Sequence, residues 1–298
     1  MAEMVPPGST IGILGSEQLG RMLAMAAARL GLKCHIYADE PGPALDVAAA
    51  HTLSPYDDHA ALTAFAAKVL AVTYEFENVP VATARHLESH VPVRPGSRAL
   101  EVAQDRLAEK QFISGLGIPV APFAAIDSAA DLSTALAAMA APAILKTRRM
   151  GYDGKGQVSL RPGVDAAAAI AEIRGVPAVL EQRLVFAQEI SVLVVRAIDG
   201  ATRTYDIPHN THKNGILDRS VVPAALDAAT MVRARDIATR IATALGYVGL
   251  LAVEMFDLGA GSPSDQRLVV NEIAPRVHNS GHWTIEACAI SQFENHMR

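Results

Sequence analysis

A stretch near the end of the chain brings several chemically useful side chains together. Residues 268–270 are apolar and predict a buried strand, and Asn271 and Glu272 follow it directly. Arg276 and His278 come a few residues later, in a segment where a proline and an Asn-Ser-Gly run interrupt regular structure. Polar and charged groups held at the end of a core strand are typical of a binding or catalytic site. A solvated loop after a core strand is the alternative interpretation of this stretch alone.

A second acidic strand lies just upstream. Residues 249–257 form an apolar run that carries Glu254, and the turn after it predicts an antiparallel return along 267–272. Glu254 and Glu272 would then lie on paired strands, with Asn271 beside them. Carboxylate and amide oxygens are the ligands that Mg²⁺ prefers, so this group predicts a magnesium site. The alternative is that Glu254 is a buried acid paired with a basic residue.

The middle of the chain offers positive charge and flexible backbone. A predicted strand ends on Lys146, and a loop with three glycines follows at 151–156. A buried lysine is costly unless it meets an anion, and the N–H groups of a glycine-rich loop can close over phosphates. The loop lacks the G-x-x-x-x-G-K-[ST] spacing of a P-loop, and a solvated hairpin is the alternative.

Two further segments could complete a nucleotide site. Residues 181–184 end one predicted strand and Glu189 begins the next, where they could hydrogen-bond an adenine edge and the ribose hydroxyls. Together with the lysine, the glycine loop and the acidic pair, they predict phosphoryl transfer by positioning and charge neutralisation. Arg276 and His278 would meet the group that receives the phosphoryl.

The first forty residues predict a strand–helix–strand unit, with strands over 10–14 and 33–37 and a helix over 18–30. Such a unit belongs to a parallel sheet, so the predicted fold class is α/β. The glycines of the first turn are not spaced as G-x-G-x-x-G, and Glu17 would oppose a pyrophosphate, which disfavours NAD. A single phosphate could still bind at the start of the helix.

A third predicted strand, over 69–73, runs into Glu75 and Glu77. Acids at this end of a parallel strand lie where such sheets bind ligands, although Glu77 could instead cap the next helix. A charged helix predicted over 97–114 divides the chain, so we expect domains over 1–104 and 105–298. Two histidines in a predicted polar loop over 209–217 lack a third ligand nearby, which disfavours zinc.

Composition limits the classes of function. The net charge of −5 argues against a nucleic-acid surface, and no apolar run has membrane-spanning length. The first nine residues lack the basic and apolar regions of a signal peptide, and two distant cysteines suit a reducing compartment. The expected setting is therefore cytoplasmic, with small molecules as partners.

At the residues discussed above, the chain resembles the N5-carboxyaminoimidazole ribonucleotide synthetase family of ATP-grasp enzymes. The resemblance runs from about residue 10 to the end. The matching segments are YEFE (74–77), QDR (104–106), KTRR (146–149), GYDGKGQ (151–157), EQ (181–182) and NEIAPRVHNSGHW (271–283). The resemblance implies a Rossmann-like pre-ATP-grasp domain, followed by an α+β ATP-grasp domain with a mobile lid at about 120–185. Without nucleotide, we expect the loop over 150–157 to be mobile.

The implied reaction is an ATP-dependent carbon–nitrogen ligation in purine biosynthesis. ATP and bicarbonate form carboxyphosphate, and 5-aminoimidazole ribonucleotide takes up its carboxyl group or the CO₂ it releases. By resemblance, the ATP contacts are Arg106, Lys146, Gly151, Tyr152, Asp153, Gly154, Lys155, Gly156, Gln157, Glu181, Gln182, Arg183, Leu184, Glu189, His212 and Asn271. The implied Mg²⁺ ligands are Glu254 and Glu272, the catalytic residues are Arg276, His278 and Asn279, and the substrate contacts are Gln18, Leu19, Glu75, Tyr152 and Asp153.

Two departures from the family pattern affect the expected substrate site. Glu17 stands in a loop that is usually richer in glycine, and the family's small C-terminal domain is expected to be missing after Arg298. The family also implies a homodimer. The competing hypotheses are an ATP-grasp ligase that joins formate to glycinamide ribonucleotide and a non-catalytic nucleotide-binding relative.

Overall fold

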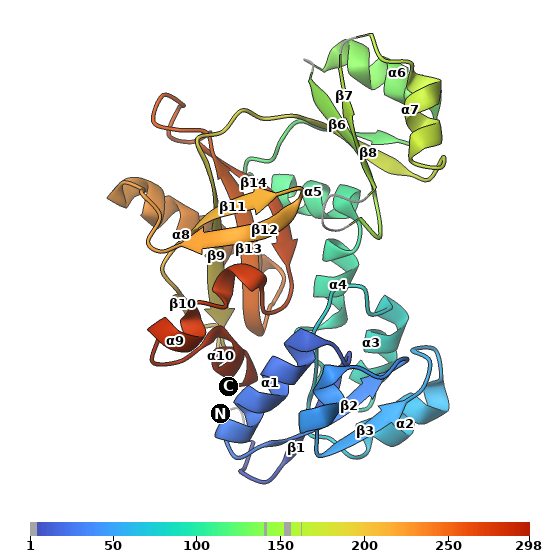
Figure 1. Ribbon diagram of the computed structural model, residues 1–298, viewed down its shortest axis with the longest axis vertical. Helices are drawn as coiled ribbons and strands as arrows, with labels where there is room; N and C mark the ends of the chain where they lie inside the picture. The colour runs from blue at the N-terminus through green and yellow to red at the C-terminus, as the bar shows by residue number, and fades with distance from the viewer. Residues whose placement is uncertain (1–4, 140–141, 152–155, 162) are drawn as a thin grey trace.

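The computed structural model describes residues 5–139, 142–151, 156–161 and 163–298. Over this part of the chain the strands form three sheets, shown in Figure 1. Four predicted site residues, Tyr152, Asp153, Gly154 and Lys155, lie outside the described residues. Within them, no helix combines the length and the apolar character needed to cross a membrane.

The N-terminal sheet has the order β3-β2-β1-β4, and every pairing in it is parallel. Its strands are β1 (Thr10–Leu14), β2 (Lys33–Ala38), β3 (Ala50–Leu53) and β4 (Val72–Tyr74), and its helices are α1 (Gln18–Arg29), η1 (Pro43–Val47), α2 (His59–Ala66) and α3 (Val81–Glu88). The predicted α/β class is confirmed. Strand β3 was not predicted, because it is short, largely exposed and not β-rich in sequence.

The central sheet has the order β12-β11-β9-β13-β14, and β10 also pairs with β9. Its elements are β9 (Gln188–Arg196), β10 (Thr202–Thr204), β11 (His209–Lys213), β12 (Ile216–Val221), β13 (Gly249–Asp257), β14 (Leu268–Ala274) and α8 (Ala228–Ala244). One face of α8 shares an apolar core with β9 and β13. The chain ends in η2 (Asn279–Gly281), α9 (Thr284–Ala287) and α10 (Gln292–Met297).

The predicted polar loop over 209–217 is wrong, because the segment forms a β-hairpin. Strands β11 and β12 pair antiparallel, and Asn214 and Gly215 between them have φ of +54° and +80°. A two-residue hairpin turn of this kind needs positive φ at both positions, which Asn-Gly supplies readily. The Asn-Gly signal was present in the sequence, but the polar side chains around it favoured a loop.

The small sheet is antiparallel, with the order β5-β8-β6-β7. Its elements are β5 (Phe123–Ile126), α6 (Ala129–Ala138), β6 (Ala143–Thr147), β7 (Gln157–Leu160), α7 (Ala166–Glu172) and β8 (Ala178–Gln182). The helices and strands enclose an apolar core of their own, built from residues within 126–180.

Two helices, α4 (Ser97–Ala103) and α5 (Arg106–Gly115), replace the single helix predicted over 97–114. The break lies at Asp105, whose backbone is extended and whose carboxylate accepts the N–H groups of Leu107 and Ala108. An aspartate in this place satisfies the first free donors of a new helix. Helix α5 contacts both β8 of the small sheet and β14 of the central sheet, and it lies between the two in Figure 1.

Candidate active site

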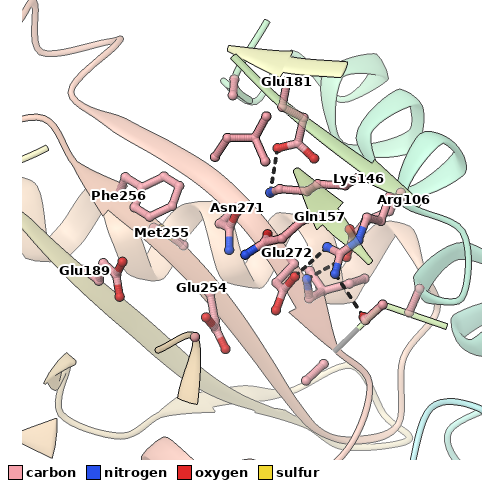
Figure 2. A pocket seen from close by; sticks show the side chains of 18 of the residues that line it. Arg106, Lys146, Gln157, Glu181, Glu189, Glu254, Met255, Phe256, Asn271 and Glu272 are labelled. Atoms are coloured by element: carbon pink, nitrogen blue, oxygen red, sulfur yellow. Dashed lines mark hydrogen bonds and ion pairs between the residues drawn. The ribbon is translucent and has the colours of Figure 1, made fainter. Parts of the chain in front are cut away.

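A cavity of about 420 Å³ opens between the small sheet and the central sheet. Its lining comes from β6 and β8 on one side, from β13 and β14 on the other, and from α5. Figure 2 shows Lys146 and Glu181 on the small-sheet side, facing Asn271 and Glu272 on the central sheet. The two sheets thus bring basic and acidic groups together across one space.

Most of the predicted site residues line this cavity. They are Arg106, Lys146, Gly151, Gln157, Glu181, Gln182, Arg183, Leu184, Glu189, His212, Glu254, Asn271, Glu272, Arg276, His278 and Asn279. Of the predicted residues that the structure describes, Gly156, Gln18, Leu19 and Glu75 lie outside the lining. Segments separated by more than 150 residues therefore meet at one site.

A β-bulge arranges the acidic end of the cavity. Glu254 on β13 pairs with Glu272 on β14, whereas Met255 pairs with Val270, so that Asn271 is an extra residue on β14. Successive side chains of a regular strand point to opposite faces, but a bulge changes that alternation. Asn271 and Glu272 consequently both line the cavity, opposite Glu254.

Each of the two carboxylates already has a basic partner. Arg106 Nη1 lies 2.9 Å from Glu272 Oε2, and His278 Nε2 lies 2.9 Å from Glu254 Oε1. Burial disfavours the charged form of Glu272, but the nearby positive charges, Arg106 first, outweigh it and hold its pKa well below the usual range. Glu254 therefore fits both interpretations of the sequence. It pairs with the side chain of His278, and it also lines the cavity.

The acidic end suits a hard cation that brings further ligands with it. Among the described residues, no group of three or more His, Cys, Asp or Glu side chains converges as a closed metal cage. Mg²⁺ commonly takes one or two protein carboxylates and completes its shell with phosphate and water oxygens. Glu254 and Glu272, with the amide of Asn271 beside them, fit that pattern.

Two lysines share one carboxylate on the opposite wall. Glu181 Oε2 lies 3.0 Å from Lys110 Nζ and 3.1 Å from Lys146 Nζ, and the Glu181 side chain is only 5% exposed. Burial opposes ionisation of Glu181, but the two lysines outweigh it and lower its pKa. Burial lowers the pKa of Lys146, so an anionic ligand beside Lys146 would stabilise its charged form.

Arg276 and His278 also line the cavity, and His278 lies beside the acidic pair. Arg276 donates to both carboxylate oxygens of Glu77 and to the carbonyl of Val277. His278 Nδ1 lies 2.9 Å from Ser280 Oγ, so the ring is held on both sides. Glu77, whose role the sequence left open, thus lies in the cavity lining and orients an arginine there.

Apolar and polar groups mix on the remaining wall. Phe186 and Phe256 stack with ring centroids 4.6 Å apart, and both line the cavity. Glu189 accepts a hydrogen bond from His212, and this bond raises the pKa of His212. An aromatic wall next to a carboxylate and a histidine could hold a flat base and a sugar.

Glu75 has a different environment from the cavity residues. Its carboxylate is 1% exposed and accepts the backbone N–H groups of Glu17 and Gly20 at the start of α1. A helix N-terminus attracts anions, and here the protein supplies one itself. Glu75 would reach a substrate only by releasing these bonds.

The sequence analysis assigned no role in the site to three charged residues around α5. Glu109 and Lys110 are buried on that helix, and Arg148 makes a two-nitrogen contact with the carboxylate of Asp105. A signal for the first two existed, because Glu109 and Lys110 lie four and three residues before the buried Ile113, on the inner face of a helix. Burial raises the pKa of Glu109 to about 8.

Comparison with known proteins agrees with this geometry. The family model of the ribonucleotide synthetase preATP-grasp domain matches residues 8–104, and that of the ATP-grasp domain matches residues 111–293. The chain is 49% identical to N5-carboxyaminoimidazole ribonucleotide synthase of Brucella melitensis, over 98% of this chain and 80% of that protein.

Two further relatives differ in length or in what they bind. The chain is 46% identical, over its full length, to 30% of the bifunctional purine synthesis protein purC/E of Dictyostelium discoideum. It superimposes with a TM-score of 0.89 and 28% identity on the Aspergillus clavatus N5-carboxyaminoimidazole synthase in complex with ADP and 5-aminoimidazole ribonucleotide, covering 98% of this chain and 76% of that one. The chain belongs to the N5-carboxyaminoimidazole ribonucleotide synthase family of ATP-grasp ligases.

Proposed function

We propose that this chain carries out the reaction of its family, the ATP-dependent carboxylation of 5-aminoimidazole ribonucleotide by bicarbonate in purine biosynthesis. The products would be N5-carboxyaminoimidazole ribonucleotide, ADP and phosphate. The observation that carries the proposal is one cavity lined by Lys146 on one wall, by Glu254 and Glu272 on the other, and also by Arg276. The names of the relatives and the ligands of the Aspergillus structure support it.

The nucleotide would lie along the length of the cavity. Glu189 and His212 would meet the ribose, residues 181–184 the adenine edge, and Phe186 and Phe256 the face of the base. Lys146 and Arg106 would neutralise the phosphates, with the loop over 151–157 covering them. Asn271 would lie beside the phosphates.

Glu254 and Glu272 would hold Mg²⁺ between the protein and the phosphates. When bound, this cation neutralises charge that develops on the phosphoryl oxygens. The pairing of Glu254 with Glu272 supports this role, because paired residues of neighbouring strands lie side by side on one face of the sheet. Arg106 and His278, which pair with these carboxylates in the structure, would then meet the anionic ligands instead.

The carboxyl transfer would take place at the end formed by Arg276, His278 and Asn279. A bicarbonate oxygen attacks the γ-phosphorus, the bond from that phosphorus to the β–γ bridging oxygen breaks, and ADP and carboxyphosphate result. The exocyclic amine then attacks the carboxyl carbon, or the CO₂ released from it, and phosphate leaves while the amine loses a proton. Arg276 offers a planar donor for the carboxyl oxygens, held in place by Glu77.

The ribonucleotide substrate would approach from the N-terminal sheet. Gln18 and Leu19, at the start of α1, and Glu75, which holds that start, are our proposed contacts for it. Tyr152 and Asp153 are proposed contacts for the aminoimidazole by resemblance alone.

The direct test is to measure ADP release by the purified chain with each pair of substrates. We expect ADP formation that requires both bicarbonate and 5-aminoimidazole ribonucleotide, with the carboxylated product identified by mass spectrometry. Dependence on formate and glycinamide ribonucleotide would instead indicate the related ligase. ATP binding without turnover in either mixture would contradict the enzymatic proposal.

We extend the proposal to the organisation of the protein. The working form would be a cytoplasmic homodimer, with domains over 1–104 and 105–298 and the lid at about 120–185, as the resemblance implies. Light scattering of the purified protein tests the dimer, and fractionation of the source cells tests the compartment.

A further inference from the structure

Two adjacent residues of α5 contact the backbone on either side of Glu272. Glu109 Oε1 accepts the N–H of Ile273 at 2.6 Å, and Lys110 Nζ lies 3.4 Å from the carbonyl oxygen of Asn271. These are the two peptide groups that flank the α-carbon of Glu272. Glu109, as an acceptor, therefore holds the peptide group after Glu272, and Lys110, as a donor, holds the peptide group before it.

The place of β14 at the edge of the central sheet explains why such contacts are needed. Backbone N–H groups that point away from β13 have no ladder partner there, and a buried N–H without a partner costs about 1–3 kcal/mol. Glu109 supplies the acceptor for Ile273 from outside the sheet. The bulge directs both Asn271 and Glu272 into the cavity, and α5 fixes the backbone that allows it.

Helix α5 is well suited to act as an anchor. Its first turn is capped by Asp105, which is itself bound by Arg148, and its buried Ile113 belongs to the apolar core that contains Val270 and Ile273. Glu109 and Lys110 are 2% and 1% exposed. Side chains this enclosed have little freedom, so the positions of their polar atoms are set by the packing around them.

Lys110 also connects the two walls of the cavity. Its Nζ lies 3.0 Å from Glu181 Oε2, and the same oxygen accepts from Lys146. One ammonium group thus touches the backbone of the acidic end and the carboxylate that orients the basic end.

We propose that Glu109 and Lys110 are positioning residues, which hold the bulge at Asn271 so that Glu272 presents its carboxylate to the cation bound with the nucleotide. The inference rests on the proposed function, because it takes Glu272 as a cation ligand. Neither residue needs to touch substrate. Residues that orient a ligand of a metal typically change metal affinity or activity about 10- to 100-fold when they are replaced.

The experiment compares metal binding with nucleotide binding in matched variants of the whole chain. Glu109→Met removes the acceptor, Glu109→Gln keeps it, and Gln111→Met places the same side chain on an exposed position of α5. Mn²⁺ binding in the presence of ADP is measured by electron paramagnetic resonance, and ADP binding without metal is measured by calorimetry. The ADP stoichiometry reports the folded fraction of each variant.

We expect Glu109→Met to weaken Mn²⁺ binding about tenfold, while Glu109→Gln and Gln111→Met stay within about twofold of the wild type. ADP binding without metal should change little in all three. A residue that only supports the fold would lower the ADP stoichiometry and leave the Mn²⁺ affinity of the folded fraction unchanged. That result in Glu109→Met would overturn the proposal.

Lys110→Met tests the other contact and keeps the proposal open to refutation if Glu109→Met does not fold. Because Lys110 holds both Asn271 and Glu181, this variant should weaken Mn²⁺ binding and metal-free ADP binding together. Wild-type affinity for both would overturn the role of Lys110. If the wild type itself binds no Mn²⁺ in the presence of ADP, the cation role proposed for Glu272 is wrong, and the inference is wrong with it. Measurement of ADP release with bicarbonate would then show separately whether the proposed reaction takes place.

Discussion

The central sheet shares apolar side chains with the elements of the N-terminal sheet, whereas charged residues of α5 join the central sheet to the small sheet. In the first junction, Ile13 of β1 and Leu23 of α1 share one buried cluster with Leu250 of β13 and Phe293 of α10. In the second, the apolar core of the small sheet is its own, and α5 is joined to that sheet by charged contacts such as the Lys110–Glu181 pair.

The two junctions therefore differ in what they contribute: the apolar one stabilises the fold, and the charged one positions the side chains of the cavity. Apolar burial stabilises in proportion to area and has no preferred direction, so the first junction can hold two domains together but cannot aim a charged group. Ion pairs add little net stability, yet they fix where a carboxylate or an ammonium lies. Substitutions in the first junction should therefore change unfolding, and substitutions in the second should change ligand binding and turnover.

The largest expected effect is on the apolar junction. Phe293→Ala removes a ring that is 2% exposed, and such a truncation costs about 3–5 kcal/mol of unfolding free energy because a cavity is left behind. Chemical denaturation of the wild type and the variant measures the loss. The affinity for ADP of the protein that stays folded should be unchanged.

Phe186→Ala is the matched control from the cavity. Its ring is 39% exposed and stacks on Phe256, so its loss should cost less than about 1 kcal/mol of stability and should weaken ADP binding instead. If the two phenylalanine variants lost the same stability and the same affinity, the division between the junctions would be wrong.

The next effect concerns the acidic end of the cavity. Glu272→Gln keeps the shape of the side chain but removes its charge, and we expect turnover with Mg²⁺ to fall about a hundredfold or more while the fold persists. Turnover is followed by ADP release at saturating substrate, and the unfolding midpoint reports the fold. Retained Mg²⁺-dependent turnover would place the metal site elsewhere.

The exposed Glu286 provides the control for this change. Glu286→Gln alters the net charge of the protein by the same amount, on the surface after η2. It should leave turnover at the wild-type level, so a loss in Glu272→Gln alone assigns the effect to the cavity.

The sequence predicted the apolar junction better than the charged one. Helical spacing from 18 to 30 marked the buried face of α1, and the strands over 10–14 and 33–37 were recognisable from their apolar runs, because burial follows a local pattern. The parallel order of the sheet followed from that unit. The hairpin at 209–221 was missed although its Asn-Gly turn was visible, since polar strand residues concealed it.

The charged junction depends on features that no local pattern contains. The type and order of Asn271 and Glu272 predicted a site, but only the pairing of Glu272 with Glu254 shows the bulge that turns both side chains to one face. The break before α5 was missed as well: aspartate commonly caps a helix, but the bonds from Asp105 to the N–H groups of Leu107 and Ala108 are visible only in the structure. Glu254 and Glu272 are 18 positions apart, and Lys110 and Asn271 are 161 apart, so pairings between separate segments decide these details.

The smallest expected effect is a pH dependence of the apolar junction. His296 lies in it, with Nε2 2.7 Å from Thr73 Oγ1 and Nδ1 3.1 Å from the backbone nitrogen of Leu250. Because Leu250 donates to Nδ1, the ring is neutral, and burial lowers its pKa from 6.5 to about 4. Between pH 4 and 6.5 the unfolded chain binds a proton that the folded chain does not, so the contribution of His296 to stability is lost as the pH falls through this window.

Between pH 6.5 and pH 5 this effect of His296 should lower the free energy of unfolding of the wild type by about 1.5 kcal/mol, because the slope reaches its full value of about 1.4 kcal/mol per pH unit only below pH 6.5. Denaturation of the wild type and of His296→Gln at several pH values isolates the contribution of His296. Glu75 and Glu109 have raised pKa values and therefore act in the opposite direction, but they do so equally in both proteins. His51→Gln, at an exposed position, should keep the wild-type slope. Equal slopes in the wild type and in His296→Gln would mean that His296 is protonated in the folded state. The apolar junction would then carry a buried charge and would resemble the charged one more than its composition suggests.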